Sequence, residues 1–294
     1  MRKSDMKPIP RIGIVILNWN KPLDTIKCLK SLNCISYKNY FSVVVDNGST
    51  DNSFDLIRSC VPNVILLRLI KNLGFAGGAN EGIKYALELG AKHVLLLNND
   101  TIVAPDFLDP LVEILERDST IGVAVPKIYY LDSPELIYAA GAEWTSIPPR
   151  IKMRGFGQRD SSQYNEPCDL EYATGCAMLI RSEVFSIVGL FDPIYFMYQE
   201  DYDFCRRVCR AGLRIVYVPE AKVWHKGSAG LGENSPDKWY QWSRSTIILY
   251  KKHFSIIALV CFLIWVFIRE MVNLNFSFLK PFLRGIYEGL RTSI

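Results

Sequence analysis

The stretch IGIVILNWN, residues 12–20, sets the fold class, because an unbroken apolar run ends abruptly in polar residues. Four further runs of this kind lie at 41–45, 64–68, 93–98 and 121–125. Short apolar runs without polar alternation are typical of strands in a parallel sheet that is covered on both faces. The pattern therefore predicts an α/β protein.

Helical segments separate these runs. We expect them near 22–33, 52–60, 77–90 and 106–117. Alternating strands and helices predict βαβ units around one mostly parallel central sheet. Ligands of such sheets bind beyond the carboxyl ends of the strands, so functional residues are expected directly after each run.

Composition excludes several classes of protein. Apolar residues make up 49% and charged residues 22% of the 294 residues, unlike disordered, collagen-like or coiled-coil chains. The net charge of +4 comes without a basic stripe interleaved with aromatics, so we expect no nucleic-acid partner. The eight cysteines are scattered, which predicts reduced thiols in a cytosolic compartment.

The middle of the chain changes character. Proline and glycine interrupt 127–180, which we expect to be an insertion that shapes a pocket. A helix is expected over 200–211, ended by Gly212, and a strand over 213–218. These segments complete a predicted domain that extends from residue 1 to 234.

Residues 235–294 are predicted to be a helical, membrane-associated segment. The apolar run 254–268 would span only about 22 Å as a helix, short of the roughly 30 Å of a bilayer core. Beyond it, apolar and mostly basic residues fall on opposite faces of one helix, as in helices that lie at a membrane surface. The alternative is a pair of helices that pack on the domain. The apolar set is Leu279, Phe282, Leu283, Ile286 and Leu290.

Polar residues follow three of the predicted strands. Because these strand ends should meet at one edge of the sheet, the polar loops should converge. A carboxylate fixed there, such as Asp46, can accept a hydrogen bond from the N–H edge of a nucleotide base, although ordinary turn chemistry is the alternative. The residues are Asn18 and Asn20 after the first run, Asp46 after the second, and Asn98, Asn99 and Asp100 after the fourth.

The segment KNLGFAGGAN, residues 71–80, places three glycines between a strand and a helix. Backbone N–H groups and a helix N-terminus can there approach an anionic or polar ligand closely. A merely flexible loop is the alternative. The spacing is not G-x-G-x-x-G, which argues against a dinucleotide-binding dehydrogenase.

Three positions are suited to metal binding or proton transfer. Asp100 could hold Mg²⁺ or Mn²⁺ against phosphate oxygens, and His225 is its candidate partner, although a lone histidine is more often structural. Glu200 and Asp201 open a predicted helix after an aromatic stretch. The helix dipole favours acidic residues there, but such a carboxylate facing a cleft can also take a proton from an acceptor hydroxyl.

Taken in order, these residues resemble family 2 glycosyltransferases of the GT-A fold, especially their rhamnosyltransferase-like branch. The likeness runs from about Ile12 to Gly232. It is most specific in TGCAMLIR (174–181), GLFD (189–192) and YQEDYD (198–203), followed by AG (211–212) and VPEA through His225.

The resemblance implies a role for each matching residue. Asp201 would be the catalytic base with Glu200 beside it, and Asp100 and His225 would bind the divalent metal. Asn98 replaces the first carboxylate of the family's D-x-D motif, so weaker metal binding is expected. Residues of the donor pocket would be Asn18, Asn20, Asp46, Asn72, Gly74, Phe75, Ala76, Gly78, Asn80, Asn98 and Asn99.

The implied reaction is an inverting, metal-dependent transfer of a sugar, with rhamnose as one candidate. The donor would be a nucleotide-diphosphate sugar and the acceptor a hydroxyl of a glycan or lipid-linked molecule, in cell-surface polysaccharide synthesis. Its expected place is the cytoplasmic face of the cell membrane, at the membrane surface. Trp144, Tyr172 and Cys176 are expected in the pocket. The competing hypotheses are a membrane-associated nucleotide-sugar binding protein without catalysis, and a structural scaffold.

Overall fold

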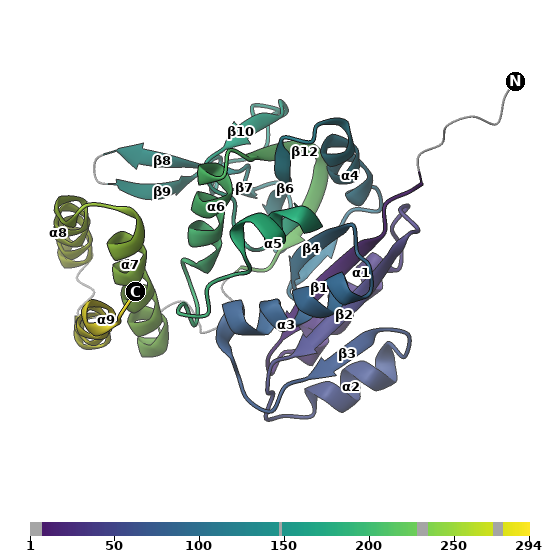
Figure 1. The fold of residues 1–294 in the computed structure, drawn as a ribbon, viewed down its shortest axis with the longest axis horizontal. Coiled ribbons are helices and arrows are strands. Elements are labelled where there is room, and N and C mark those ends of the chain that lie inside the picture. The colour runs from purple at the N-terminus through teal and green to yellow at the C-terminus, as the bar shows by residue number, and fades with distance from the viewer. Residues whose placement is uncertain (1–7, 147–148, 228–234, 273–278) are drawn as a thin grey trace, which may run out of the picture.

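The computed structural model describes residues 8–146, 149–227, 235–272 and 279–294. Helices cover both faces of a central sheet, and three C-terminal helices pack at one end of the molecule (Figure 1). Ten described strands form this sheet. Its main path is β10 (Cys168–Leu170), β12 (Arg214–His225), β6 (Ile121–Tyr130), β11 (Ala177–Arg181), β4 (His93–Asn98), β1 (Ile12–Asn18), β2 (Tyr40–Asp46) and β3 (Ile65–Arg68).

The N-terminal half of the sheet is parallel, which confirms the prediction. β1 pairs in parallel with β2 and with β4, and β2 pairs in parallel with β3. The register places Asn18 beside Asp46 and Leu17 beside Asn98. The polar residues after the first, second and fourth strands therefore meet at one edge of the sheet.

Strand β11 corrects the prediction for 127–180. It runs antiparallel between β4 and β6, in the middle of the sheet, and four of its five residues are buried. This part of the stretch therefore belongs to the main sheet and is not an insertion. An apolar run of this length cannot be assigned from periodicity alone, which explains the error.

Strand β12 is longer than the predicted strand at 213–218. It runs for 12 residues parallel to β6, with a register shift between Val218 and Lys222. Pro219 lies in this irregular part, where a residue without an N–H group is tolerated. The continuation carries His225 to a position opposite Thr101 in β5 (Thr101–Val103).

Of the remaining strands within 127–180, one joins the main sheet and two project from it. β7 (Ile137–Ala139) pairs with the far end of β6. β8 (Ala142–Ser146) and β9 (Pro149–Met153) form a separate two-stranded sheet that points toward the C-terminal helices (Figure 1).

Alternating strand residues supply two cores, one on each face of the sheet. Val15 and Val45 pack on the side of α3, whereas Ile14 and Ile16 pack on the side of α1 and α4. The helices before the C-terminal segment are α1 (Pro22–Leu32), α2 (Ser53–Cys60), α3 (Gly74–Glu88), α4 (Leu108–Arg117), α5 (Ser182–Val188) and α6 (Glu200–Arg210).

Helix α3 begins at Gly74, three residues before the predicted start, so its glycines lie within the helix. A Cβ atom on Gly78 would lie 2.5 Å from Leu17 Cδ1, and one on Gly82 would lie 2.4 Å from Val15 Cγ1. Both distances are too short for non-bonded carbons. These two glycines therefore allow α3 to pack directly on the sheet.

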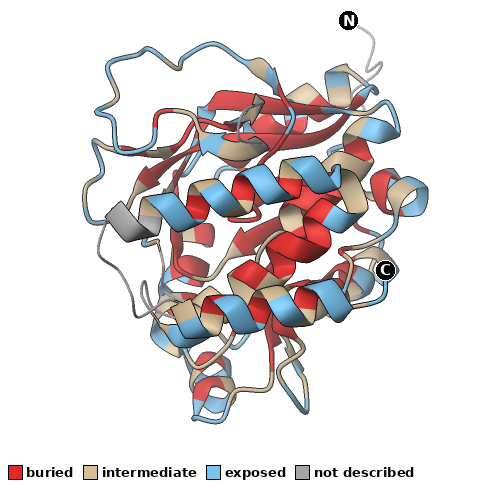
Figure 2. Cartoon of the chain, turned by 90° about the vertical axis from the view of Figure 1, so that its left-hand side faces the viewer, coloured by how far each residue is buried: buried red, intermediate tan, exposed pale blue. Residues whose placement is uncertain are grey.

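Three helices form the C-terminal segment: α7 (Pro236–His253), α8 (Ile256–Val272) and α9 (Leu279–Arg291). Helix α7 packs against the main domain on one face and against α8 and α9 on the other. Ile248 and Leu249 belong to the main core, whereas Ile247 and Tyr250 pack with α8 and α9. Figure 2 looks onto this end and shows α7 largely buried behind α8 and α9.

Helix α9 uses part of its apolar face for packing on α7. Phe282 is buried, and a Cβ atom on Gly285 would lie 2.4 Å from the Tyr240 carbonyl oxygen. Leu283 and Leu290, which share the predicted apolar face, are 54% and 52% exposed. None of the described helices is both long and apolar enough to cross a bilayer.

Candidate active site

One pocket of about 590 Å³ lies where the polar strand ends meet. Residues that follow β1 and β4 and the last residue of β12 line one wall. The start of α6, strand β9 and the inner faces of α7 and α8 line the others. A concave site with convergent polar groups at the carboxyl ends of strands is the expected place for ligand binding.

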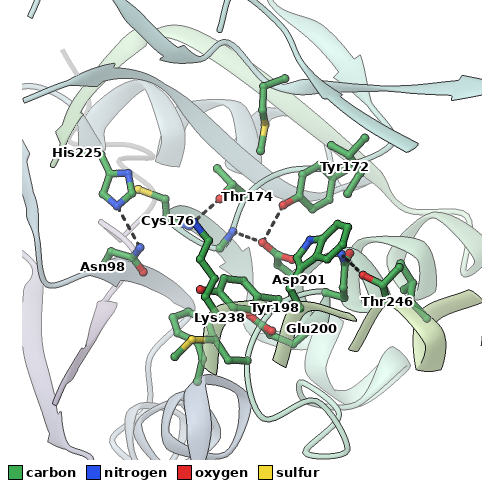
Figure 3. A pocket seen from close by; sticks show the side chains of 18 of the residues that line it. Asn98, Tyr172, Thr174, Cys176, Tyr198, Glu200, Asp201, His225, Lys238 and Thr246 are labelled. Carbon is green, nitrogen blue, oxygen red and sulfur yellow. Dashed lines mark hydrogen bonds between the residues drawn. The ribbon is translucent and has the colours of Figure 1, made fainter. Parts of the chain in front are cut away.

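Asp201 lies in the first turn of α6 and lines this pocket. Its Oδ2 accepts hydrogen bonds from the Tyr172 hydroxyl at 2.8 Å and from the Gly175 N–H at 2.9 Å (Figure 3). Burial raises the pKa of Asp201, and these hydrogen bonds oppose that rise. The result is an oriented carboxylate with raised basicity, as proton abstraction requires.

Glu200 lies beside it in the same pocket wall and is 6% exposed. Its Oε2 has no hydrogen-bond partner among the described residues. Burial and the neighbouring Asp201 charge raise the pKa of Glu200 well above its usual range. A buried polar atom without a partner marks a point where a ligand group could be satisfied.

Two strained residues precede these acids. Tyr198 and Gln199 have φ angles of 68° and 69°, in the left-handed region that non-glycine residues avoid. The Gln199 amide donates a hydrogen bond to Thr246 Oγ1 of α7 at 3.1 Å. Strain of this kind is maintained only where surrounding contacts enforce it, and here it precedes the turn that presents Glu200 and Asp201.

Asp203, the third acid of the cluster, does not line the pocket. It is fully buried, forms ion pairs with Lys252 at 2.6 Å and with Arg207 at 2.8 Å, and lies 2.8 Å from His253 Nε2. Two of these partners lie at the end of α7. Asp203 therefore links α6 to α7. Of the three acidic residues at this helix start, Asp203 has a structural role, whereas Glu200 and Asp201 face the pocket.

Asp100 and His225 come together across the pocket from Asp201. Asp100 Oδ1 lies 3.1 Å from His225 Nε2. The Asn98 amide lies 3.4 Å from the same nitrogen, a contact that Figure 3 shows. Burial disfavours the charged ring, but Cys176 and Asp100 beside it raise the pKa of His225 to about 10. Asp100 and His225, which are distant in the sequence, are thus brought into direct contact by the fold.

These two residues fit a small divalent cation. Their 3.1 Å separation is close to that of adjacent ligands in an octahedral site with bonds of about 2.1 Å. The described residues contain no group of three or more His, Cys, Asp or Glu side chains that could hold a metal. A site with so few protein ligands suits a cation that also binds substrate phosphates.

The loops after β1 and β2 are hydrogen-bonded to each other beside the pocket. The Asn18 amide donates to Asp46 Oδ1 at 3.0 Å, and the Thr50 N–H donates to Asn20 Oδ1 at 2.9 Å. Asn18, Asn20 and Asp46 are not among the pocket-lining residues. Their contact with a nucleotide base stays a prediction.

The segment 71–80 differs from the expectation of N–H groups open to a ligand. The Gly74 N–H donates to Asn72 Oδ1 at 2.8 Å, and the Phe75 N–H donates to the Phe196 carbonyl at 2.7 Å. The Asn80 amide bonds both backbone groups of Phe191. These groups are therefore satisfied within the protein.

Only part of the predicted donor set lines the pocket. Phe75, Asn98 and Asn99 do so, whereas Asn72, Gly74, Ala76, Gly78 and Asn80 do not. Ala76 is fully buried in the core, which explains its position away from the pocket. The donor contacts predicted for these residues remain untested.

A family model for glycosyl transferase family 2 matches residues 13–187, which is more than half of the chain. The chain belongs to glycosyl transferase family 2. This family 2 protein is a glycosyltransferase, and its fold is of the GT-A type.

Named relatives and a solved structure agree with this assignment. The N-acetylglucosaminyl-diphospho-decaprenol L-rhamnosyltransferase of Mycobacterium tuberculosis is 27% identical over 258 residues, 81% of this chain and 83% of the relative. The dTDP-rhamnosyl transferase RfbF of Shigella flexneri is 22% identical over 297 residues, 95% of each chain. The crystal structure of GalNAc-T7 with UDP, GalNAc and Mn²⁺ has a TM-score of 0.67 at 18% identity, over 83% of this chain and 48% of that one.

The pocket of this family 2 enzyme also contains residues that the sequence analysis does not predict. Tyr172 and Cys176 line it as expected, whereas the Trp144 side chain lies outside the described residues. Several of the residues not predicted are aromatic or basic and lie within 127–180 or in the C-terminal helices. In the sequence they cannot be told from ordinary core or surface residues, because they form no motif with a recognisable spacing. The additional residues include Tyr138, Arg150, Lys238, Trp242, Trp265 and Arg269.

Proposed function

We propose that this family 2 enzyme is an inverting, metal-dependent transferase in cell-surface polysaccharide synthesis. It moves a sugar, with rhamnose as the first candidate, from a nucleotide-diphosphate donor to a hydroxyl of a glycan or lipid-linked acceptor. The observation that carries the proposal is the pocket with Asp201 on one side and His225 on the other (Figure 3), where His225 is paired with Asp100. An inverting transfer needs the base and the departing group on opposite faces of the anomeric carbon.

Asp201 acts as the base in this proposal. It takes the proton of the acceptor hydroxyl while that oxygen forms the new bond to the anomeric carbon. The bond from this carbon to the nucleotide diphosphate breaks at the same time, so the configuration inverts. Tyr172 and Gly175 keep the carboxylate in one orientation through their bonds to Oδ2.

Asp100 and His225 would hold the divalent cation, either Mg²⁺ or Mn²⁺. Such a cation supplies positive charge that neutralises the departing diphosphate. Support comes from the fit of the 3.1 Å pair to an octahedral cation and from the Mn²⁺ and UDP in the GalNAc-T7 structure. Asn98 contributes an uncharged amide where a second carboxylate would bind more tightly.

The donor would lie between this pair and the loops after β1 and β2. Trp19, Phe75 and Asn99 line the pocket, and Asp46, which is hydrogen-bonded to Asn18 beside it, would contact the nucleotide base. Two relatives named as rhamnosyltransferases support rhamnose as the sugar.

The proposal also divides the chain into a catalytic domain, 1–234, and a membrane-associated segment, 235–294, at the cytoplasmic face of the membrane. Helix α8 supports this division because its two faces differ. Phe262 and Trp265 face the pocket. Ile257, Ile264 and Phe267 are 71%, 54% and 47% exposed on the other face. Exposed apolar residues gathered on one helix face are typical of contact with a membrane surface.

Donor turnover by the purified protein tests the proposed activity. The full chain is incubated with dTDP-rhamnose, UDP-sugars or GDP-mannose, with and without Mn²⁺, and release of nucleoside diphosphate is measured. We expect metal-dependent turnover of one donor. Asp201→Asn should lower it by about 100-fold or more while leaving the donor Kd nearly unchanged.

Glu171→Gln is the matched control, because Glu171 is an exposed carboxylate near α6 that does not line the pocket. It should retain wild-type turnover. Unchanged turnover in Asp201→Asn would remove the assignment of the base. Donor binding without turnover by the wild type would instead indicate a binding protein.

A further inference from the structure

Two arginines approach one indole ring in the pocket wall formed by β9 and α8. Arg150 Cζ lies 4.5 Å from the centre of the Trp265 ring, and Arg269 Cζ lies 4.8 Å from it. All three residues line the pocket. A cation over an indole ring is favourable, and the two guanidinium groups bring positive charge to this wall of the pocket.

Arg150 has no anionic partner in the part of the chain that the structure describes. It forms no ion pair there, and its Nε is buried without a hydrogen-bond acceptor. A buried guanidinium N–H normally has an acceptor, because leaving it unsatisfied costs free energy. The arrangement is therefore suited to an anion that enters the pocket.

The surroundings indicate what kind of anion would fit. Guanidinium groups bind phosphate oxygens through two parallel N–H bonds. Trp242 and Phe262 add aromatic surface nearby. Arg269 and Trp265 lie on the inner face of α8, while its outer face carries exposed apolar residues such as Ile264. A molecule with a phosphate group next to an apolar chain matches both features.

We propose that Arg150 and Arg269 bind the phosphate or diphosphate group that links the acceptor to a membrane lipid, with Trp265 as the platform. This inference rests on the proposed function, since it names the class of acceptor. The donor also carries a diphosphate, but Asp100 and His225 are its expected place, and they come from other elements of the fold.

Geranyl diphosphate is a suitable probe, because it combines a diphosphate with a short apolar chain. Its binding to the full chain is measured by calorimetry in EDTA, so that no metal supports the donor site. We expect binding that is stronger than that of geraniol or of inorganic pyrophosphate. Arg150→Gln should weaken it by about tenfold or more, because a charge-assisted bond is lost.

Arg159→Gln is the matched control. Arg159 follows the same hairpin, its side chain is 77% exposed, and it does not line the pocket. This variant should bind geranyl diphosphate like the wild type. Arg150→Lys, which keeps the charge without the planar fork, should fall between the wild type and Arg150→Gln.

A second measurement separates this inference from the proposed function. UDP and dTDP binding with Mn²⁺ should survive Arg150→Gln and be weakened by Asp100→Asn. No geranyl diphosphate binding by the wild type, equal binding by Arg150→Gln, or loss of nucleotide binding in Arg150→Gln would overturn the inference. If nucleotides do not bind and geranyl diphosphate behaves as expected, the proposed function fails and the anion site stands.

Discussion

The hydroxyl of Tyr172 donates a hydrogen bond of 2.8 Å to Asp201 Oδ2, the oxygen that also accepts the Gly175 N–H. Tyr172 lies just after β10, and Asp201 lies in the first turn of α6, so the bond joins residues that are 29 positions apart. It lowers the pKa of Asp201 against the opposite effect of burial. This contact therefore orients the carboxylate and also limits the rise of its pKa that burial causes.

Tyr172→Phe should lower kcat/KM by about tenfold, since a hydrogen bond to a charged group is lost. Without that bond the pKa of Asp201 rises further, and the base is active only when deprotonated. The acid limb of the pH profile should therefore move to higher pH. Tyr164→Phe, in a loop outside the pocket, is the control. An unmoved acid limb would contradict a role for Tyr172 in setting the base.

Asp203→Asn should destabilise the fold by about 3 kcal/mol, because it leaves Lys252 and Arg207 without their buried counter-charge. Burial opposes ionisation, but His253, Lys252 and Arg207 hold the pKa of Asp203 well below its usual range. A depressed pKa stabilises the folded state above the unfolded value, near 4, and this stabilisation is lost as the pH falls. The difference between wild type and variant should thus be constant at neutral pH and shrink below about pH 4.

Denaturant unfolding at several pH values measures that difference. Glu113→Gln is the control, because Glu113 forms an exposed pair with Arg117 on α4. It should change stability little at any pH. A gap between wild type and Asp203→Asn that persists unchanged at pH 3 would argue against the titration of Asp203.

Gly285→Ala should loosen α9 from α7. The new methyl group would meet the Tyr240 carbonyl oxygen and the Arg244 nitrogen at 2.4 Å and 3.0 Å, so the helices must separate. We expect a loss of about 1–3 kcal/mol in the free energy of unfolding and faster protease cleavage near 279. Leu283→Ala, on the exposed side of α9, should change it much less. Equal effects in both variants would show that close packing at Gly285 is unimportant.

Ile264→Glu should weaken binding to anionic phospholipid vesicles by about tenfold, because it places a charge on the outer face of α8. Sedimentation with vesicles measures the bound fraction. Ile187→Glu is the matched control, since Ile187 is 60% exposed on α5. If both variants bind like the wild type, α8 does not contact the lipid.

The sequence predicts the parallel half of the sheet well, because each strand there is an apolar run that ends in a polar loop. Asn18 and Asp46 lie side by side for that reason. Strand β11 is less visible, because it joins the sheet through pairings with β4 and β6 that only the folded chain creates. The continuation of β12 past Pro219 is hidden for the same reason.

The site follows a similar division. Asp201, Asp100 and His225 stand in recognisable motifs, and the fold brings Asp100 and His225 to 3.1 Å from each other. Asp203 belongs to the same acidic motif as Asp201, yet it pairs with Lys252 of α7. No local sequence pattern indicates this contact. Arg150 and Trp265 are far apart in sequence and meet only through the packing of β9 on α8. Such pairs depend on tertiary contacts and cannot be derived from spacing.

Helix α7 limits how the protein can be dissected. A chain shortened to residue 234 would keep every family motif but lose Lys252 and His253, the partners of Asp203. It would also lose Trp242, Thr246 and Leu249 from the pocket. The proposed boundary at 234 therefore does not separate two structurally independent parts. Inactivity of such a fragment would say nothing about whether the removed helices touch a membrane.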